Sequence, residues 1–122
     1  MLFLPDSAAL RTVFEAGRHH PTLSKMDNGD LVMVVIRRVD FRDGRLASYR
    51  RGCDAVVSHD HGETWDTGRM LVLDDFAHCD GDQWMRGACG HLSSTLLTDG
   101  PILTGYSSVS TGAVMVRWRP EA

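Results

Sequence analysis

The eight residues from Ser58 to Trp65, SHDHGETW, constrain the fold of this chain more than any other feature. The Asp60 carboxylate can accept hydrogen bonds from backbone N–H groups of a tight turn, and Gly62 can adopt the left-handed conformation that such a turn requires. The hydroxyls of Ser58 and Thr64 can close the turn, and the Trp65 ring can pack between strands with its indole N–H on an acceptor. We therefore predict a structural turn between two strands.

A metal site is the alternative interpretation of this segment, because His59 and His61 flank the Asp60 carboxylate. Side chains that alternate along an extended segment rarely converge on one ion, so the turn is favoured. A second set of candidate zinc ligands has a spacing that matches no common zinc pattern: His78, Cys79, Cys89 and His91. We predict no metal and no cofactor.

The rest of the chain has the pattern of a β protein. Its apolar runs are short, rich in β-branched residues and bounded by turn residues, which favours strands over helices. Strands are expected at residues 22–26, 31–37, 55–58, 70–73, 94–97, 102–106 and 113–118, and a short helix only at residues 8–16. The Asn-Gly and Asp-Gly pairs within residues 27–30 and 98–101 predict two hairpin turns.

These two hairpins form an internal repeat. His20 and the Asn-Gly turn superpose on His91 and the Asp-Gly turn at an offset of 71 residues. Self-similarity at a fixed interval, with room for four strands in each interval, predicts β-propeller blades rather than a sandwich. We expect a single partial propeller unit over residues 1–122. Its first four-stranded antiparallel blade spans about residues 17–75, a connecting loop about 76–90, and a second blade without a clear fourth strand about 91–120.

The pattern Ser-x-Asp-x-Gly-x-Thr-Trp of residues 58–65 is an Asp-box. With an arginine ahead of the first strand, residues 17–120 resemble the sialidase (neuraminidase) superfamily and the wider BNR Asp-box repeat proteins. The resemblance implies a six-bladed propeller and a glycan-related function. That function is either exo-glycosidase-like hydrolysis or the recognition of an acidic or neutral sugar. The alternative is a non-catalytic carbohydrate-binding or interaction module that lacks the nucleophile and base.

The resemblance also implies roles for particular residues. In sialidases, arginines near the first and second strands hold the substrate carboxylate, and an aspartate in the following loop is the general acid/base. Arg18, Arg37 with its neighbour Arg38, and Asp43 fall in similar places. Counting back from the Asn-Gly turn puts His19, rather than Arg18, at the first arginine position.

In sialidases a nucleophilic tyrosine precedes a strand of the last blade, and this chain has His91 at the equivalent position. No glutamate base is identified for it. His91 also matches His20 in the repeat, so both histidines have a common structural explanation as residues at the start of a blade. The loop over residues 80–88 carries Trp84, which could stack on a sugar ring, and Arg86, which could supply polar contacts.

Composition narrows the partners. The net charge is -3 with both signs spread along the chain, so nucleic acid is not expected. The longest apolar stretch, residues 31–36, is too short to cross a membrane, and the N-terminus lacks a signal peptide pattern, which favours the cytoplasm. Two blades do not close a ring of about four to eight blades. We therefore expect either the remainder of a longer propeller or self-association, with three copies building a ring of six.

Overall fold

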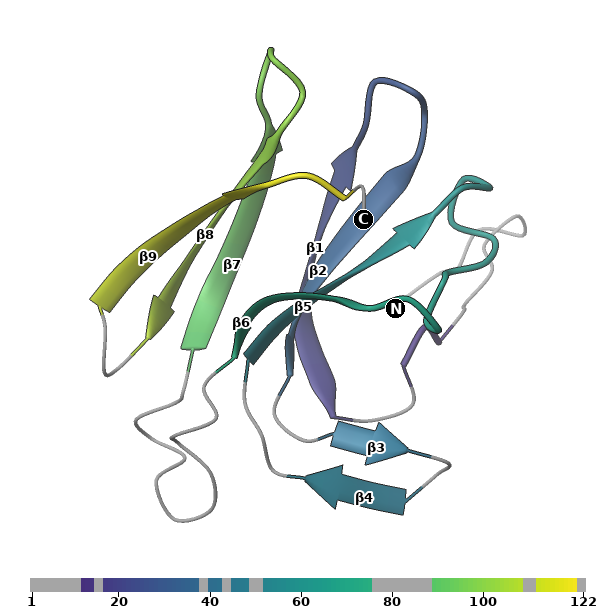
Figure 1. Ribbon diagram of the computed structural model, residues 1–122, viewed down its shortest axis with the longest axis vertical. Helices are drawn as coiled ribbons and strands as arrows, with labels where there is room; N and C mark the ends of the chain where they lie inside the picture. The colour runs from purple at the N-terminus through teal and green to yellow at the C-terminus, as the bar shows by residue number, and fades with distance from the viewer. Residues whose placement is uncertain are drawn as a thin grey trace, which may run out of the picture.

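The computed structural model describes residues 12–14, 17–37, 40–42, 45–48, 52–75, 89–108 and 112–120. Within these residues the chain is all-β, as predicted, with no helix (Figure 1). The strands are β1 (Arg18–Lys25), β2 (Leu31–Arg37), β3 (Asp40–Arg42), β4 (Arg45–Ser48), β5 (Gly52–Ser58), β6 (Leu71–Asp75), β7 (Cys89–Leu96), β8 (Ile102–Ser108) and β9 (Gly112–Trp118). Most of the helix expected at residues 8–16 lies outside the described residues.

The strands form two antiparallel meanders. One sheet has the order β1-β2-β5-β6, the other has the order β7-β8-β9, and β3 and β4 make a separate small hairpin between β2 and β5. β2 has the predicted bounds, whereas β1 begins four residues earlier than predicted. The prediction missed Arg18 to Pro21 because these residues carry no apolar alternation. The β3-β4 hairpin was not predicted, since residues 40–48 contain no apolar run.

The 71-residue repeat is confirmed by strand register. In the first sheet Lys25 lies opposite Leu31, and in the second sheet Leu96 lies opposite Ile102. The turns also match, because the amides of Gly29 and Gly100 each donate to a carbonyl three residues earlier at 3.0 Å. Both glycines have positive φ, 93° and 104°, as the two predicted turns require.

The repeat extends to an irregularity in the first strand of each hairpin. In β1 the register shifts between His19 and Thr22, and in β7 it shifts between Gly90 and Ser93. Two residues therefore face one residue of the neighbouring strand at each shift, which is a β-bulge. His20 lies in the first bulge with a left-handed φ of 54°.

The two sheets pack face to face with a shared apolar core. β7 lies against β1 and β2, so the sheets stand side by side in Figure 1. Val32, Val34 and Ala55 of the first sheet pack with Ile102 of the second. Tyr106 adds a polar tie between the sheets, because its hydroxyl donates to the carboxylate of Asp74. Burial of these side chains is the main stabilising contribution to the pair of sheets.

The second sheet stops at β9, which has a strand neighbour on one side only among the described residues. By register β9 corresponds to β5, since Trp118 lies opposite Ile102 as Ser58 lies opposite Leu31. In the first sheet β5 is followed by β6, so the described second sheet has no counterpart of β6.

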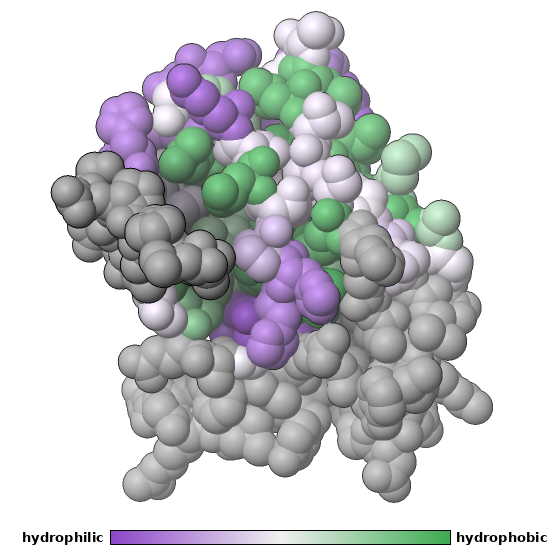
Figure 2. Space-filling view, turned by 180° about the vertical axis from the view of Figure 1, so that it is seen from behind, coloured by the Kyte–Doolittle hydropathy of each residue, from purple (hydrophilic) through white to green (hydrophobic). Residues whose placement is uncertain are grey.

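Apolar side chains also reach the surface between polar ones on the face turned away from the viewer of Figure 1 (Figure 2).

Candidate functional site

Two arginines and one aspartate meet at the end of the first sheet where β2 stops. Arg18 of β1 lies opposite Arg37 of β2, and Asp54 of β5 projects from the same face of the sheet. Arg18 Nε donates to Asp54 Oδ2 at 3.2 Å, and Arg37 Nε lies 2.9 Å from the same oxygen. Cross-strand register thus gathers three charges that are far apart in the sequence.

This cluster is almost closed to solvent. The exposed fractions of the side chains are 13% for Arg18, 6% for Arg37 and 2% for Asp54. The guanidinium carbon of Arg18 lies 5.1 Å from the centre of the Phe14 ring, within the range of a cation–π contact. Desolvated charges are tolerated in a protein when they are paired, so the three side chains depend on one another.

Gly52 makes room for the Arg37 guanidinium. It lies opposite Arg37 in the β2-β5 pairing. A Cβ atom at this position would lie 2.5 Å from Arg37 Nη2 and even closer to the carbonyl oxygen of Asp74. Since the carbonyl is backbone and cannot swing away, only glycine fits between Arg37 and β6.

Electrostatics at the centre of the cluster is dominated by desolvation. Burial raises the pKa of Asp54 above its ordinary value of 3.8, and the positive charges of Arg37 and then Arg18 oppose that rise. The two guanidinium groups beside the carboxylate favour its ionised form and offset part of the cost of burying it. The two ion pairs to Asp54 in turn hold the Arg18 and Arg37 side chains in place.

The bulge in β1 decides which residue joins this cluster. Counting back from the turn without a bulge put His19 at the arginine position. The bulge at His20 and Pro21 absorbs one residue, so Arg18 is the residue that lies opposite Arg37. His19 is exposed and lies opposite Ile36, on the other face of the strand. The register therefore places Arg18, and not His19, beside Arg37, and the expected substrate-binding role of His19 stays a prediction.

Other candidate residues are not brought into the described site. His91 lies in β7 at the bulge that matches the bulge of His20, and only its backbone is described. That shared place agrees with the structural explanation of both histidines. The remaining candidates lie outside the described residues: Arg38, Asp43, Trp84 and Arg86.

The Asp-box forms the predicted turn. Asp60 accepts hydrogen bonds from the Thr64 amide at 2.8 Å, the Thr64 hydroxyl at 2.5 Å and the Ser58 hydroxyl at 2.8 Å. The Gly62 amide donates to Ser58 Oγ at 2.8 Å, and Gly62 has a φ of 86°. Hydrogen bonds from the Thr64 side chain and backbone and from Ser58 lower the pKa of Asp60 from 3.8 to about 2. The motif is a staple between β5 and the segment leading to β6.

One part of that prediction is wrong. Trp65 is only half-buried rather than packed between strands. Its ring edge instead lies near Gly62 of the same turn. Of the histidines beside Asp60, His59 pairs with Asp30 through Nδ1 at 2.9 Å. In the described part of the chain, no group of three His, Cys, Asp or Glu side chains is placed to hold a metal ion.

Asp54 was not identified from the sequence, although a signal was present. It stands alone in the otherwise uncharged run Gly52 to Ser58, which forms a buried strand. A single carboxylate in such a strand requires a cation close by, because an unpaired buried charge is very unfavourable. The sequence alone does not say which of the many arginines supplies it.

Comparisons with known proteins add no relative: no family model, no curated protein and no solved structure matches this chain. The described residues also include no helix with the length and apolar character that a membrane crossing needs.

Proposed function

We propose that this chain is an Asp-box unit of a sialidase-like β-propeller and that it recognises a glycan carrying a carboxylate. The observation that carries the proposal is the placement of Arg18 and Arg37. They lie opposite each other on neighbouring strands, beside one aspartate that contacts both. Two guanidinium groups held in a fixed relation are suited to a planar carboxylate, because each presents a fork of donors that matches the two carboxylate oxygens.

In this proposal Asp54 is a positioning residue. Both ion pairs engage Nε, the nitrogen nearest the side-chain stem, so the carboxylate holds each guanidinium by its inner edge. Of the two arginines, Arg18 is the more exposed, at 13% against 6% for Arg37, so the sugar carboxylate would approach the cluster from the Arg18 side. Gly52 supports the arrangement by leaving space for Arg37 Nη2.

Between hydrolysis and binding, the described residues favour binding without turnover. His91 stands where the resemblance implies a nucleophilic tyrosine, and its backbone lies at a bulge repeated at His20. A bulge common to both sheets accounts for a histidine there without a catalytic role. Hydrolysis is the second candidate and depends on Asp43 as general acid/base.

The two candidates are separated by measuring affinity and turnover on the same protein. Calorimetric titration with sialyllactose should detect binding that the variant Arg37→Gln loses, while Lys25→Gln, at an exposed position on β1, binds as the parent does. A fluorogenic sialoside and a small panel of aryl glycosides test turnover, with Asp43→Asn as the comparison. Turnover that Asp43→Asn removes supports hydrolysis. A folded chain that binds no acidic sugar contradicts both candidates.

We also propose that the chain completes a propeller with other blades. Support comes from the repeat of two similar sheets packed side by side and from the unpaired side of β9 among the described residues. Three copies with two blades each would build a closed ring of six, which leaves only short, protected sheet edges. Light scattering on the purified chain tests the ring: a trimer is expected, and a folded monomer rules it out.

A further inference from the structure

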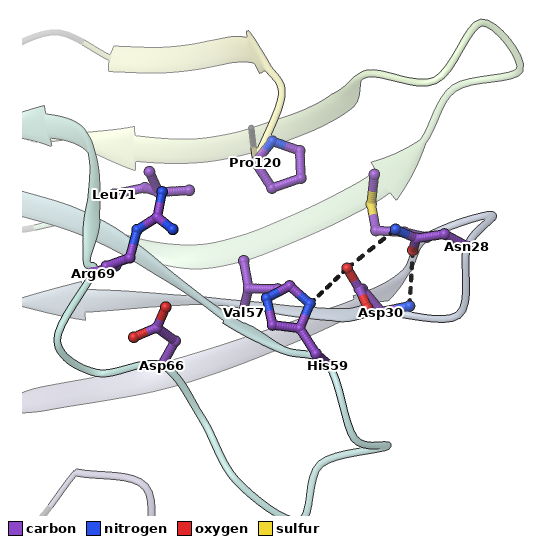
Figure 3. Close-up of a pocket in the computed structure, with 9 residues that line it drawn as sticks. Asn28, Asp30, Val57, His59, Asp66, Arg69, Leu71 and Pro120 are labelled. Carbon is purple, nitrogen blue, oxygen red and sulfur yellow. Dashed lines mark hydrogen bonds and ion pairs between the residues drawn. The ribbon is translucent and has the colours of Figure 1, made fainter. Parts of the chain in front are cut away.

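A separate pocket lies at the opposite end of the first sheet from the arginine cluster. It has a volume of about 230 Å³ and opens between the β1-β2 turn, the Asp-box and the segment that leads into β6 (Figure 3). β2 runs from this end to Arg37, and its seven residues separate the two places by roughly 20 Å. The pocket is therefore independent of the proposed glycan site.

The floor of the pocket is apolar. Met26, Val57 and Leu71 line it and also pack against the core that joins the two sheets, and Pro120 closes the opposite side. These side chains are fixed by the core behind them. The floor can therefore accept an aliphatic group without rearrangement.

One wall is polar but already satisfied. Asp30 Oδ2 lies 2.9 Å from His59 Nδ1 and accepts a hydrogen bond from Asn28 Nδ2 at 3.1 Å. The Asp30 amide in turn donates to Asn28 Oδ1 at 2.9 Å. Because these three side chains already bind one another, the ligand is expected to contact other polar groups of the pocket.

The other wall carries two opposite charges, and neither has a partner among the described residues. Asp66 and Arg69 both line the pocket, and within the described part of the chain neither side chain has an ion pair or hydrogen bond. Their backbone is fixed, because the Asp66 amide donates to the Val57 carbonyl at 2.9 Å and the Arg69 amide donates to the Asp66 carbonyl at 3.1 Å. The turn thus presents a half-buried carboxylate and an exposed guanidinium to the same pocket, beside its apolar floor.

We propose that this pocket binds a small zwitterion, namely a free α-amino acid with an aliphatic side chain. The ligand carboxylate pairs with the Arg69 guanidinium, the ligand ammonium pairs with the Asp66 carboxylate, and the side chain lies on Met26, Val57 and Leu71. The volume is below the roughly 300–1,000 Å³ of pockets for drug-sized ligands, which suits a molecule of this size. A neutral polyol would fill the space but would form an ion pair with neither side chain.

The test is an NMR titration of the ¹⁵N-labelled chain with L-leucine at millimolar concentrations. The expected result is saturable shifts of the amides of Asp66, Arg69 and Leu71. 4-Methylpentanoate lacks the ammonium, 3-methylbutylamine lacks the carboxylate, and glucose is neutral. We expect each to bind about tenfold more weakly than leucine or not at all, because one or both charge pairs are missing.

Two variants distinguish a specific site from nonspecific binding to the surface. Asp66→Asn and Arg69→Gln should each weaken leucine binding about tenfold, with unchanged spectra in the absence of ligand. Asp27→Asn and Lys25→Gln remove one charge of each sign from exposed positions that do not line the pocket, and they should bind leucine as the parent does. The proposal is overturned if leucine causes no shifts here, if a singly charged analogue or glucose binds equally well, or if Asp66→Asn and Arg69→Gln keep full affinity.

Discussion

Arg18 and Arg37 lie opposite each other on β1 and β2, and the Nε atoms of both approach the same oxygen of Asp54, at 3.2 and 2.9 Å. The Asp54 side chain is 2% exposed, so water has little access to its carboxylate. A buried charge of one sign between two of the other makes the aspartate the centre of the cluster.

The first prediction concerns that centre. Asp54→Asn keeps the shape of the side chain and removes its charge, which leaves two desolvated guanidinium groups without their carboxylate. We expect the free energy of unfolding in urea to fall by about 3–5 kcal/mol. Asp99→Asn is the matched control, because Asp99 pairs with Arg117 where both side chains are more than half exposed, and it should cost about 0–1 kcal/mol. Equal losses in the two variants would contradict a buried cluster.

The second prediction concerns the space beside Arg37. A methyl group in Gly52→Ala would press on Arg37 Nη2 and the Asp74 carbonyl, and we expect a loss of about 1–3 kcal/mol in thermal or urea unfolding. Gly105→Ala in β8 is the control, since a Cβ there meets its nearest neighbour at 3.9 Å. It should be neutral within about 0.5 kcal/mol. A neutral Gly52→Ala would mean that β5 and β6 lie farther apart than described.

The third prediction concerns pH. Hydrogen bonds from Thr64 and Ser58 lower the pKa of Asp60 from 3.8 to about 2 in the folded chain. Stability from this carboxylate is therefore present above pH 3.8 and is lost as the pH falls toward about 2. The stability difference between the parent and Asp60→Asn should shrink over that interval. The raised pKa of Asp54 acts in the opposite direction but equally in both proteins. A difference that does not change with pH would contradict the hydrogen-bonded turn.

The fourth prediction concerns the second sheet. Thr104 is fully buried, accepts a hydrogen bond from Trp118 Nε1 at 2.9 Å and shares another with the Ser94 hydroxyl at 2.9 Å. Thr104→Val keeps the shape of the side chain but leaves Trp118 Nε1 and the Ser94 hydroxyl without their hydrogen-bond partner. The free energy of unfolding should therefore fall by about 1–3 kcal/mol. Thr95→Val, at an exposed position on β7, should change it by less than about 0.5 kcal/mol. Thr104→Val with parent-like stability would show that the bonds are replaced by water.

Local features of the sequence predicted the hairpins well. Glycines at positions 29 and 100 need positive φ, and short apolar runs next to the turns predict β2 and β8, so turn chemistry and pattern agree. The turn of the Asp-box was predicted, apart from Trp65, because its hydrogen-bonding partners lie within a few residues of one another. Local chemistry is what a sequence displays directly.

The site was harder to predict because it depends on register. Because the bulge at His20 contains one extra residue, Arg18 and not His19 lies opposite Arg37. A bulge leaves no clear mark in the sequence. Asp54 joins the cluster only once β5 is paired with β2 in the observed register. The hairpin of β3 and β4 was missed because its residues lack the apolar alternation that marks a strand.

The most direct measurement of the central proposal locates an acidic sugar on the first sheet. We would titrate the ¹⁵N-labelled chain with sialyllactose and follow backbone amide shifts in the parent and in Arg37→Gln. The account predicts saturable shifts at Arg18, Arg37 and Gly52 in the parent, none at the Asp-box turn, and loss of all of them in the folded variant. No shifts at the arginine cluster, or shifts confined to the Asp-box end of the sheet, would contradict it.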